Sequence, residues 1–194
     1  MKKIKGENGY IDYYKKQYLI ISVAFLVAVM TIYIIGNIFA KSYFVYFAVL
    51  SALMILPASQ YLTKYLLFVR YKSGASDYYE KFKGLHEQML VLSDLIVVKG
   101  KQTLYFDFII FSDKNILACH KQKSGDVKKN ERLQVAKSLL QNIYHPNGYD
   151  IPIIVFDCEE ELLAYLIKNV ASIMNSNNEA KQDKLANLIL NSAI

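Results

Sequence analysis

The sequence predicts a two-helix transmembrane hairpin followed by a cytoplasmic α/β domain, and two observations lead to this fold class. First, residues 18–39 and 42–63 form two apolar runs of 22 residues, and neither run contains a charge. A bilayer core about 30 Å thick is crossed by about 20 helical residues, so each run is long enough to span it. Second, helical and strand periodicities alternate after residue 72, which is typical of a mixed sheet covered by helices.

The first apolar run follows several lysines, as the core of a signal peptide does, but we interpret it as a membrane span. A signal core is only about 7–15 residues long and ends at a small-x-small cleavage site. This run is longer, Phe39-Ala40-Lys41 is a poor cleavage site, and a second run follows directly. We therefore expect a basic segment at residues 1–17 and the hairpin with its juxtamembrane extension at residues 18–72.

The placement of basic residues predicts that both termini lie in the cytoplasm, with the chain passing twice through the cell membrane. Lysine and arginine concentrate in the cytoplasmic flanks of membrane spans. Residues 1–72 hold nine basic residues against two acidic ones, a net charge of +7, and only Lys41 lies between the spans. Residues 73–194 hold fourteen against fifteen, a net charge of −1. The basic excess therefore predicts contact with the bilayer and its anionic headgroups, and makes nucleic acid an unlikely partner.

Residues 73–194 are expected to form the α/β domain, a mixed sheet of about four strands in the order α-β-β-β-α-β-α-α. The first helix is predicted from the helical spacing of Phe82, Leu85, Met89 and Leu92, and Asp157 is expected to cap the helix after the last strand. The predicted elements are helix Asp77–Leu92, strands Leu95–Val98, Thr103–Phe111 and Ile116–Lys121, helix Glu131–Ile143, strand Ile151–Phe156, a helix after Asp157, and helix Glu179–Asn191.

The cysteine content predicts neither a disulfide nor a structural zinc site. Cys119 and Cys158 are the two cysteines of the chain, and they do not form a C-x-x-C pair. Both fall on the predicted cytoplasmic side, where thiols stay reduced. Acidic residues, including Glu159-Glu160-Glu161, surround Cys158 without a base to lower its pKa, so we expect an inert thiol. No cofactor is expected.

One stretch, FDFIIFSDKNILACHK at residues 106–121, resembles the core of the restriction-endonuclease-like superfamily, within it the nuclease-related (NERD) domain. The resemblance covers roughly residues 77–157 and lies mostly in the order of elements. It implies that an aspartate on the second strand and a Glu-x-Lys on the third hold a divalent metal and position water. Asp107 matches the aspartate, but Cys119 or His120 occupies the glutamate position, depending on the alignment. If the protein is an enzyme, its candidate catalytic residues are Asp107, His120 and Lys121.

Each candidate also has a structural interpretation. A carboxylate between two phenylalanines requires a partner when it is buried, so Asp107 is expected to pair with Lys121 or His120 on the next strand. The single basic patch of the domain could meet lipid headgroups, an acidic partner or phosphate, or could be a solvated loop. It comprises Lys121, Lys123, Lys128 and Lys129.

The sequence therefore favours a small membrane protein whose α/β domain serves for binding or scaffolding without catalysis. A membrane-tethered divergent nuclease-like enzyme is the first alternative, and an accessory subunit of a larger membrane complex is the second. The spacings Ala24-xxx-Ala28 and Ala48-xxx-Ala52 allow close helix packing and are compatible with a homo-oligomer or a protein partner. The absence of tryptophan and the presence of only two arginines suggest a bacterial source.

Overall fold

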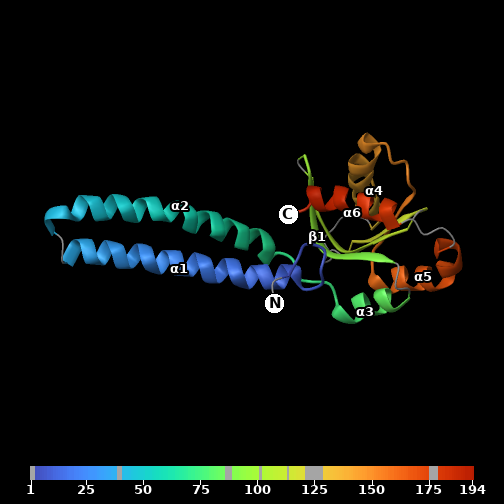
Figure 1. The fold of residues 1–194 in the computed structure, drawn as a ribbon, viewed down its shortest axis with the longest axis horizontal. Coiled ribbons are helices and arrows are strands. Elements are labelled where there is room, and N and C mark those ends of the chain that lie inside the picture. Colours follow the sequence, from blue (N-terminus) through green and yellow to red (C-terminus); the bar gives the residue numbers. More distant parts are fainter. Residues whose placement is uncertain are drawn as a thin grey trace. The chain divides into compact units, whose positions relative to one another are not determined.

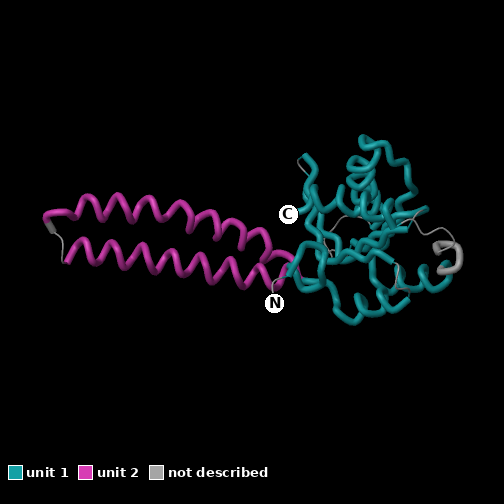
Figure 2. The backbone as a smooth tube through the Cα atoms, in the orientation of Figure 1, with its two compact units in different colours: residues 1–10, 73–194 teal, residues 11–72 magenta. Residues whose placement is uncertain are grey.

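The computed structural model describes residues 3–38, 41–85, 89–100, 102–112, 114–120, 129–174 and 179–194. The chain divides into two compact units, shown in Figure 2. One unit comprises residues 11–72, and the other comprises residues 1–10 together with residues 73–194. The N-terminal residues thus belong to the same unit as the α/β domain, a connection that the sequence did not predict.

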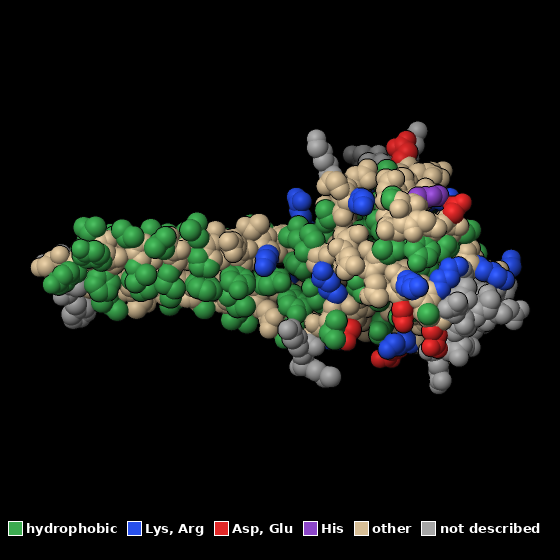
Figure 3. All heavy atoms as spheres, turned by 45° about the horizontal axis from the view of Figure 1, so that its top comes forward, with side chains coloured by type: hydrophobic (Ala, Val, Ile, Leu, Met, Phe, Trp, Pro, Cys, Tyr) green, Lys and Arg blue, Asp and Glu red, His purple; other side chains and the backbone are tan. Residues whose placement is uncertain are grey.

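The unit of residues 11–72 consists of two long helices. Helix α1 spans Tyr10–Ile38, a short 3-10 helix η1 spans Lys41–Tyr43, and helix α2 spans Phe44–Val69. Both helices are long and apolar enough to cross a membrane. In each helix, only 11% of an 18-residue apolar stretch is buried. Hydrophobic side chains cover the visible face of both helices in Figure 3. The helices are longer than the predicted spans, because α1 begins at Tyr10 and α2 ends at Val69.

The second unit contains a four-stranded mixed sheet, as the sequence predicts, and its strands lie side by side in the order β1-β2-β3-β4. Strands β1, β2 and β3 are antiparallel neighbours, while β3 and β4 are parallel. The elements are α3 Ser76–Leu85, β1 Leu90–Lys99, β2 Gln102–Phe111, β3 Ile116–Cys119, α4 Lys129–Tyr144, η2 His145–Asn147, β4 Ile153–Phe156, α5 Glu159–Met174 and α6 Glu179–Ser192.

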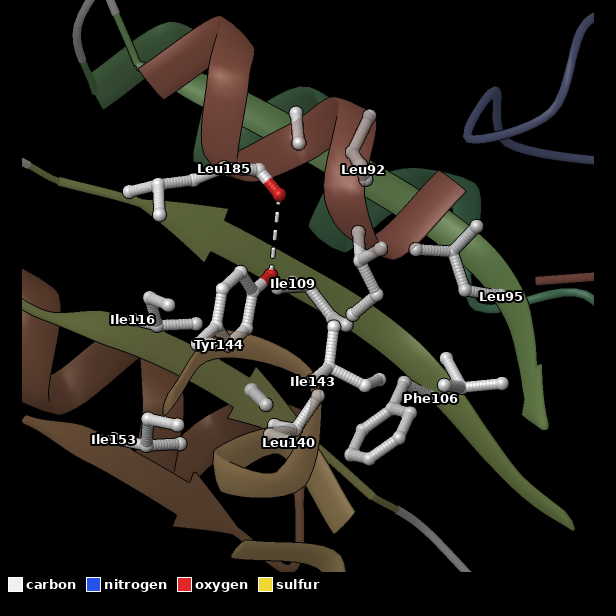
Figure 4. Packing of buried hydrophobic residues seen from close by; sticks show 14 of the residues in the cluster. Leu92, Leu95, Phe106, Ile109, Ile116, Leu140, Ile143, Tyr144, Ile153 and Leu185 are labelled. Carbon is white, nitrogen blue, oxygen red and sulfur yellow. Dashed lines mark hydrogen bonds between the residues drawn. The ribbon is translucent and has the colours of Figure 1, made fainter. Parts of the chain in front are cut away.

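Helices cover both faces of this sheet, with α4 and α6 on one face and α3 and α5 on the other (Figure 1). The larger core lies under α4 and α6, and Figure 4 shows Tyr144 at its centre. The Tyr144 hydroxyl donates a hydrogen bond to the carbonyl oxygen of Leu185 at 3.3 Å, and this bond joins the two helices over the sheet. Burial raises the pKa of Tyr144 far above its ordinary value.

Both chain ends protect the outer edge of β1. The Ser93 amide donates to the Gly6 carbonyl at 2.8 Å, and the Ile194 amide donates to the Ile96 carbonyl at 2.9 Å. An unpaired strand edge is a template for aggregation, so these two bridges remove a liability of the fold. They also explain why residues 3–10 pack with the α/β unit.

The predicted helix Asp77–Leu92 is wrong in its second half. Helix α3 ends at Leu85, and β1 begins at Leu90 and is ten residues long, not the predicted Leu95–Val98. The apolar residues near position 90 fit a helical spacing, but they pair in register with β2, as Leu92 does with Ile109. Strand pairing buries Val91 and Leu92 almost fully, and this burial outweighs the local pattern.

Candidate functional site

Four polar residues lie on β1 and β2 and directly after β3 and β4. The β1–β2 register pairs Ser93 with Phe108 and Leu95 with Phe106, which sets Asp94 opposite Asp107. His120 directly follows the Cys119 of the Phe108–Cys119 pair, and Asp157 directly follows the Phe156 of the Cys119–Phe156 pair. We call Asp94, Asp107, His120 and Asp157 the polar row. Its first three members are nearly inaccessible, with exposed fractions of 1%, 6% and 4%.

Asp94 is constrained both in its backbone and in its side chain. Its φ of 57° lies in the left-handed region, which aspartate enters more readily than most side chains. Its Oδ2 accepts a hydrogen bond from the Gly9 amide at 2.7 Å, and its Oδ1 accepts one from the Gly74 amide at 2.8 Å. The Tyr105 hydroxyl also donates to Oδ1, at 3.1 Å. Three donors compensate the desolvation of this buried carboxylate.

A side chain would be unfavourable at both glycines that supply the backbone donors. Gly9 has a φ of +83°, which strains residues with side chains. A Cβ on Gly74 would lie 2.9 Å from Cζ of Phe108, closer than side chains tolerate. The side-chain amide of Asn8 also donates a hydrogen bond to the Gly74 carbonyl at 3.2 Å, so the segments that contain Gly9 and Gly74 are joined directly. We call these contacts of Asp94, Gly9, Gly74 and Tyr105 the Asp94 clamp.

The Asp94 clamp holds the two places where the chain leaves and re-enters the α/β unit. Gly9 directly precedes α1, and Gly74 lies five residues after the end of α2. One carboxylate on β1 therefore fixes both connections to residues 11–72. Sequence analysis missed this site, although Ser93-Asp94 is a polar pair in an otherwise apolar strand and a glycine lies on each side of the hairpin.

Asp107 on β2 and His120 directly after β3 are two of the three candidate catalytic residues, and each lies one residue beyond the Phe108–Cys119 pair. His120 Nδ1 lies 2.6 Å from the Tyr105 carbonyl oxygen, and because a carbonyl only accepts, Nδ1 carries a proton and donates it. The His120 ring also lies 5.7 Å from the Phe106 ring, centroid to centroid. The third candidate, Lys121, lies outside the described residues, and the expected partner of Asp107 stays a prediction.

The described residues do not fit the divalent metal that the nuclease resemblance implies. Magnesium prefers oxygen ligands, so Asp107 would need a second carboxylate. Its neighbour Asp94 already accepts three hydrogen bonds from the protein, and its other neighbour, His120, offers nitrogen. Among the described residues, no group of three or more His, Cys, Asp or Glu side chains is placed to hold a metal ion.

Asp157, the last member of the polar row, belongs to a second, more exposed group. Its carboxylate lies 3.4 Å from Nη2 of Arg132 and 3.6 Å from Nζ of Lys129. Lys129 also donates to Glu161 at 2.9 Å, and this hydrogen bond raises the pKa of Lys129. We call Lys129, Arg132, Asp157 and Glu161 the ion-pair cluster. It lies at the carboxyl end of β4, where α4 and α5 begin.

The basic patch is thus tied to acidic residues at its one described member. Lys129 contacts two carboxylates, while Lys121, Lys123 and Lys128 lie outside the described residues. The expected cap of α5 is wrong, because the helix begins at Glu159 and this places Cys158 before its first turn. The Asp157 carboxylate instead binds the side chains of α4.

The two cysteines and the other acidic and imidazole groups near them offer little reactive chemistry. Cys119 is fully buried. Burial also raises the pKa of the Cys158 thiol, so this thiol stays protonated at neutral pH. Glu160 accepts a hydrogen bond from the Tyr78 hydroxyl at 2.9 Å and so joins α5 to α3. His145 is exposed, 3.6 Å from Asp150, and His86 lies outside the described residues.

One open groove of about 350 Å³ lies between η2 and α6, away from the polar row. Its lining offers amide and ammonium donors but no carboxylate, thiol or imidazole. The residues are Asn147, Tyr149, Lys184, Asn187, Leu188 and Asn191. Such a lining can bind polar groups by hydrogen bonds but has no group suited to general acid–base catalysis at neutral pH.

The fold and its polar sites define a class of protein: two long apolar helices joined to a four-stranded mixed α/β unit. No family model, curated protein or solved structure matches this chain.

Proposed function

We propose that this chain is a double-spanning membrane protein that presents its α/β unit to the cytoplasm as a non-catalytic binding or scaffolding domain. The apolar side chains of α1 and α2 support the membrane part of this proposal. Met30 and Val45, for example, expose 66% and 70% of their surface, which water disfavours and lipid tails do not. The lysines on the flanks of the hairpin support the cytoplasmic location of both termini.

The observation that carries the non-catalytic part is the internal use of charged groups along the polar row. The Asp94 carboxylate accepts hydrogen bonds from three protein donors, and the Asp157 carboxylate forms ion pairs with two cationic side chains. The His120 ring donates a hydrogen bond to a backbone carbonyl. Groups that are engaged in this way stabilise the fold and are not available to bind a substrate or a metal. The polar row is therefore better suited to holding the unit together than to chemistry.

Membrane fractionation of the full chain tests the first part. We expect the protein to remain in the membrane pellet after sodium carbonate extraction, and a tag at either terminus to be digested by protease in inverted vesicles but not in intact cells. Extraction into the soluble fraction, or a tag protected in inverted vesicles, would contradict the anchor or its orientation.

A second experiment distinguishes binding from catalysis. The nuclease-like alternative is favoured by one observation: Asp107 and His120 each lie one residue beyond the paired Phe108 and Cys119. If it were correct, millimolar Mg²⁺ or Mn²⁺ would raise the melting temperature of the detergent-solubilised chain, and Asp107→Asn would abolish both this shift and the cleavage of a labelled oligonucleotide. We expect neither a shift nor cleavage. A stable complex recovered only by cross-linking in intact membranes would favour the accessory-subunit alternative.

A further inference from the structure

On both helices of the hairpin, the apolar stretch ends at the same level along the helix axes, at Tyr18 on α1 and Lys64 on α2. Residues 19–38 of α1 and residues 44–63 of α2 are uncharged stretches of equal length. At a rise of about 1.5 Å per residue, each stretch measures about 30 Å, the thickness of a bilayer core. If the hairpin spans the membrane as proposed above, Tyr18 and Lys64 lie at the edge of the headgroup layer.

Aromatic rings hold Lys64 at this level. Its Nζ lies 5.7 Å from the ring centroid of Tyr18 on α1 and 5.6 Å from that of Tyr61 on α2. The two ring centroids are 6.2 Å apart, and Phe25 stacks against Tyr61 at 5.8 Å. A ring face attracts a cation but leaves its N–H donors available. No carboxylate of the described residues pairs with Lys64, so its ammonium is positioned without being neutralised.

Two further cations lie on the same side of the boundary. Lys16 is two residues before Tyr18 and Arg70 is six after Lys64, about 3 Å and 9 Å along the helices. Both are exposed, and neither has an acidic partner within the described ranges. Lys15 differs, because it donates to the Tyr71 carbonyl at 2.7 Å and to Asp12 at 3.1 Å. Long side chains can reach several ångströms along a helix, so all three cations can reach the headgroup layer, which is about 5–7 Å deep.

We propose that Lys64, Lys16 and Arg70 bind the headgroups of anionic phospholipids at this edge of the bilayer. These three residues prefer anionic to zwitterionic lipids for two reasons. Three uncompensated cations attract a net negative headgroup, and the Tyr18 and Tyr61 faces that could bind a choline are occupied by Lys64. This proposal rests on the membrane location proposed above and adds to it the class of lipid and the residues that bind it.

The test uses the full chain in nanodiscs that contain phosphatidylcholine and phosphatidylglycerol, with the retained lipids identified by native mass spectrometry. We expect Lys64→Gln to lower the ratio of retained phosphatidylglycerol to phosphatidylcholine about fivefold, which corresponds to ~1 kcal/mol per basic residue. The triple variant Lys16→Gln, Lys64→Gln, Arg70→Gln should lose the preference entirely. High salt should weaken the preference of the wild-type chain.

A matched control removes the same charge elsewhere. Lys114, Lys168 and Lys184 are exposed lysines of the α/β unit, and changing all three to glutamine should leave lipid selectivity unchanged. An unchanged selectivity in the first triple variant, or an equal loss in the control, would overturn the proposed headgroup binding. Carbonate-resistant association with neutral vesicles reports on the membrane anchor separately. A chain that inserts without selecting anionic lipid overturns the headgroup binding alone, and a chain that does not insert overturns both proposals.

Discussion

The Asp94 clamp and the ion-pair cluster both use an aspartate of the polar row to join distant parts of the chain, but they do so in opposite environments. Asp94 is 1% exposed, and its donors are two backbone amides and a phenol. The Asp157 side chain is 26% exposed, and its partners are the charged groups of Arg132 and Lys129. The same residue type therefore makes neutral contacts in the interior and ionic contacts at the surface.

This difference indicates that the Asp94 clamp stabilises the α/β unit more than the ion-pair cluster does. Ion pairs near the surface contribute about 0–1 kcal/mol, because water already solvates both partners well. A buried donor that loses its acceptor costs about 1–3 kcal/mol, because no water replaces it. The clamp should thus be sensitive to small changes and insensitive to salt, whereas the ion-pair cluster should show the reverse.

Removing the Asp94 carboxylate should have the largest effect. Asp94→Ala leaves the Gly9 and Gly74 amides without their acceptor and adds strain at a φ of 57°, so we expect a loss of about 3–5 kcal/mol in the free energy of unfolding. Asp94→Asn keeps an acceptor oxygen and tolerates the same φ, so about 2 kcal/mol should be lost. The alanine variant tests the clamp as a whole, and the asparagine variant tests its charge.

A thiol-reactive dye provides the measurement. Both cysteines lie in the α/β unit, and Cys119 is fully buried, so in a Cys158→Ala background the dye reports the unfolding of this unit alone. At a few degrees per kcal/mol, Asp94→Ala should lower the melting temperature by about 10–15 °C. A decrease of only one or two degrees would show that the clamp contributes no more than a surface contact.

Gly74→Ala should have the next largest effect, because the new Cβ would lie 2.9 Å from the Phe108 ring. Either the ring or the segment must move, and we expect a loss of about 1–3 kcal/mol in the same assay. Gly84→Ala is the matched control: Gly84 lies in α3 with no atom within 4 Å of an added Cβ. There alanine should stabilise the helix by about 0.5–1 kcal/mol, and destabilisation by both substitutions would argue against a specific close approach at Gly74.

Most of the fold could be predicted from the sequence, because its long elements have clear periodicity. The order of helices and strands in the α/β unit agrees with the prediction, and β2 differs from it by one residue, beginning at Gln102. The failure near Leu90 has a physical cause. A short apolar run fits either a helix or a buried strand, and only its pairing with β2, more than ten residues away, decides between them.

The clamp could not be predicted in the same way. Asp94 binds the amides of Gly9 and Gly74, which are 85 and 20 residues away in the chain. Every residue other than proline has such an amide, so a sequence does not reveal which one a carboxylate will bind. Asp107 attracted attention because its flanking phenylalanines made it conspicuous. The two connections to residues 11–72 are instead held by Asp94 on the neighbouring strand.

Tyr105→Phe should have a moderate effect on the clamp. It removes one of the three donors to Asp94, the hydroxyl at 3.1 Å, and keeps the ring. We expect a loss of about 1–2 kcal/mol, because the carboxylate keeps both backbone donors. Combined with Asp94→Asn, the two losses should not add, since both act on one contact. Full additivity of the two melting shifts would mean that the hydroxyl stabilises the unit by another route.

Arg132→Gln should have the smallest effect, and it tests the other side of the comparison. The substitution removes the ionic contact with Asp157 at 3.4 Å, and we expect a loss of about 0.5–1 kcal/mol. Lys137→Gln on the same helix controls for the loss of one positive charge. Because salt screens exposed charges more than buried ones, the penalty of Arg132→Gln should shrink in high salt while that of Asp94→Asn stays constant. If both penalties instead responded equally to salt, the contrast between a buried clamp and a surface ion-pair cluster would fail.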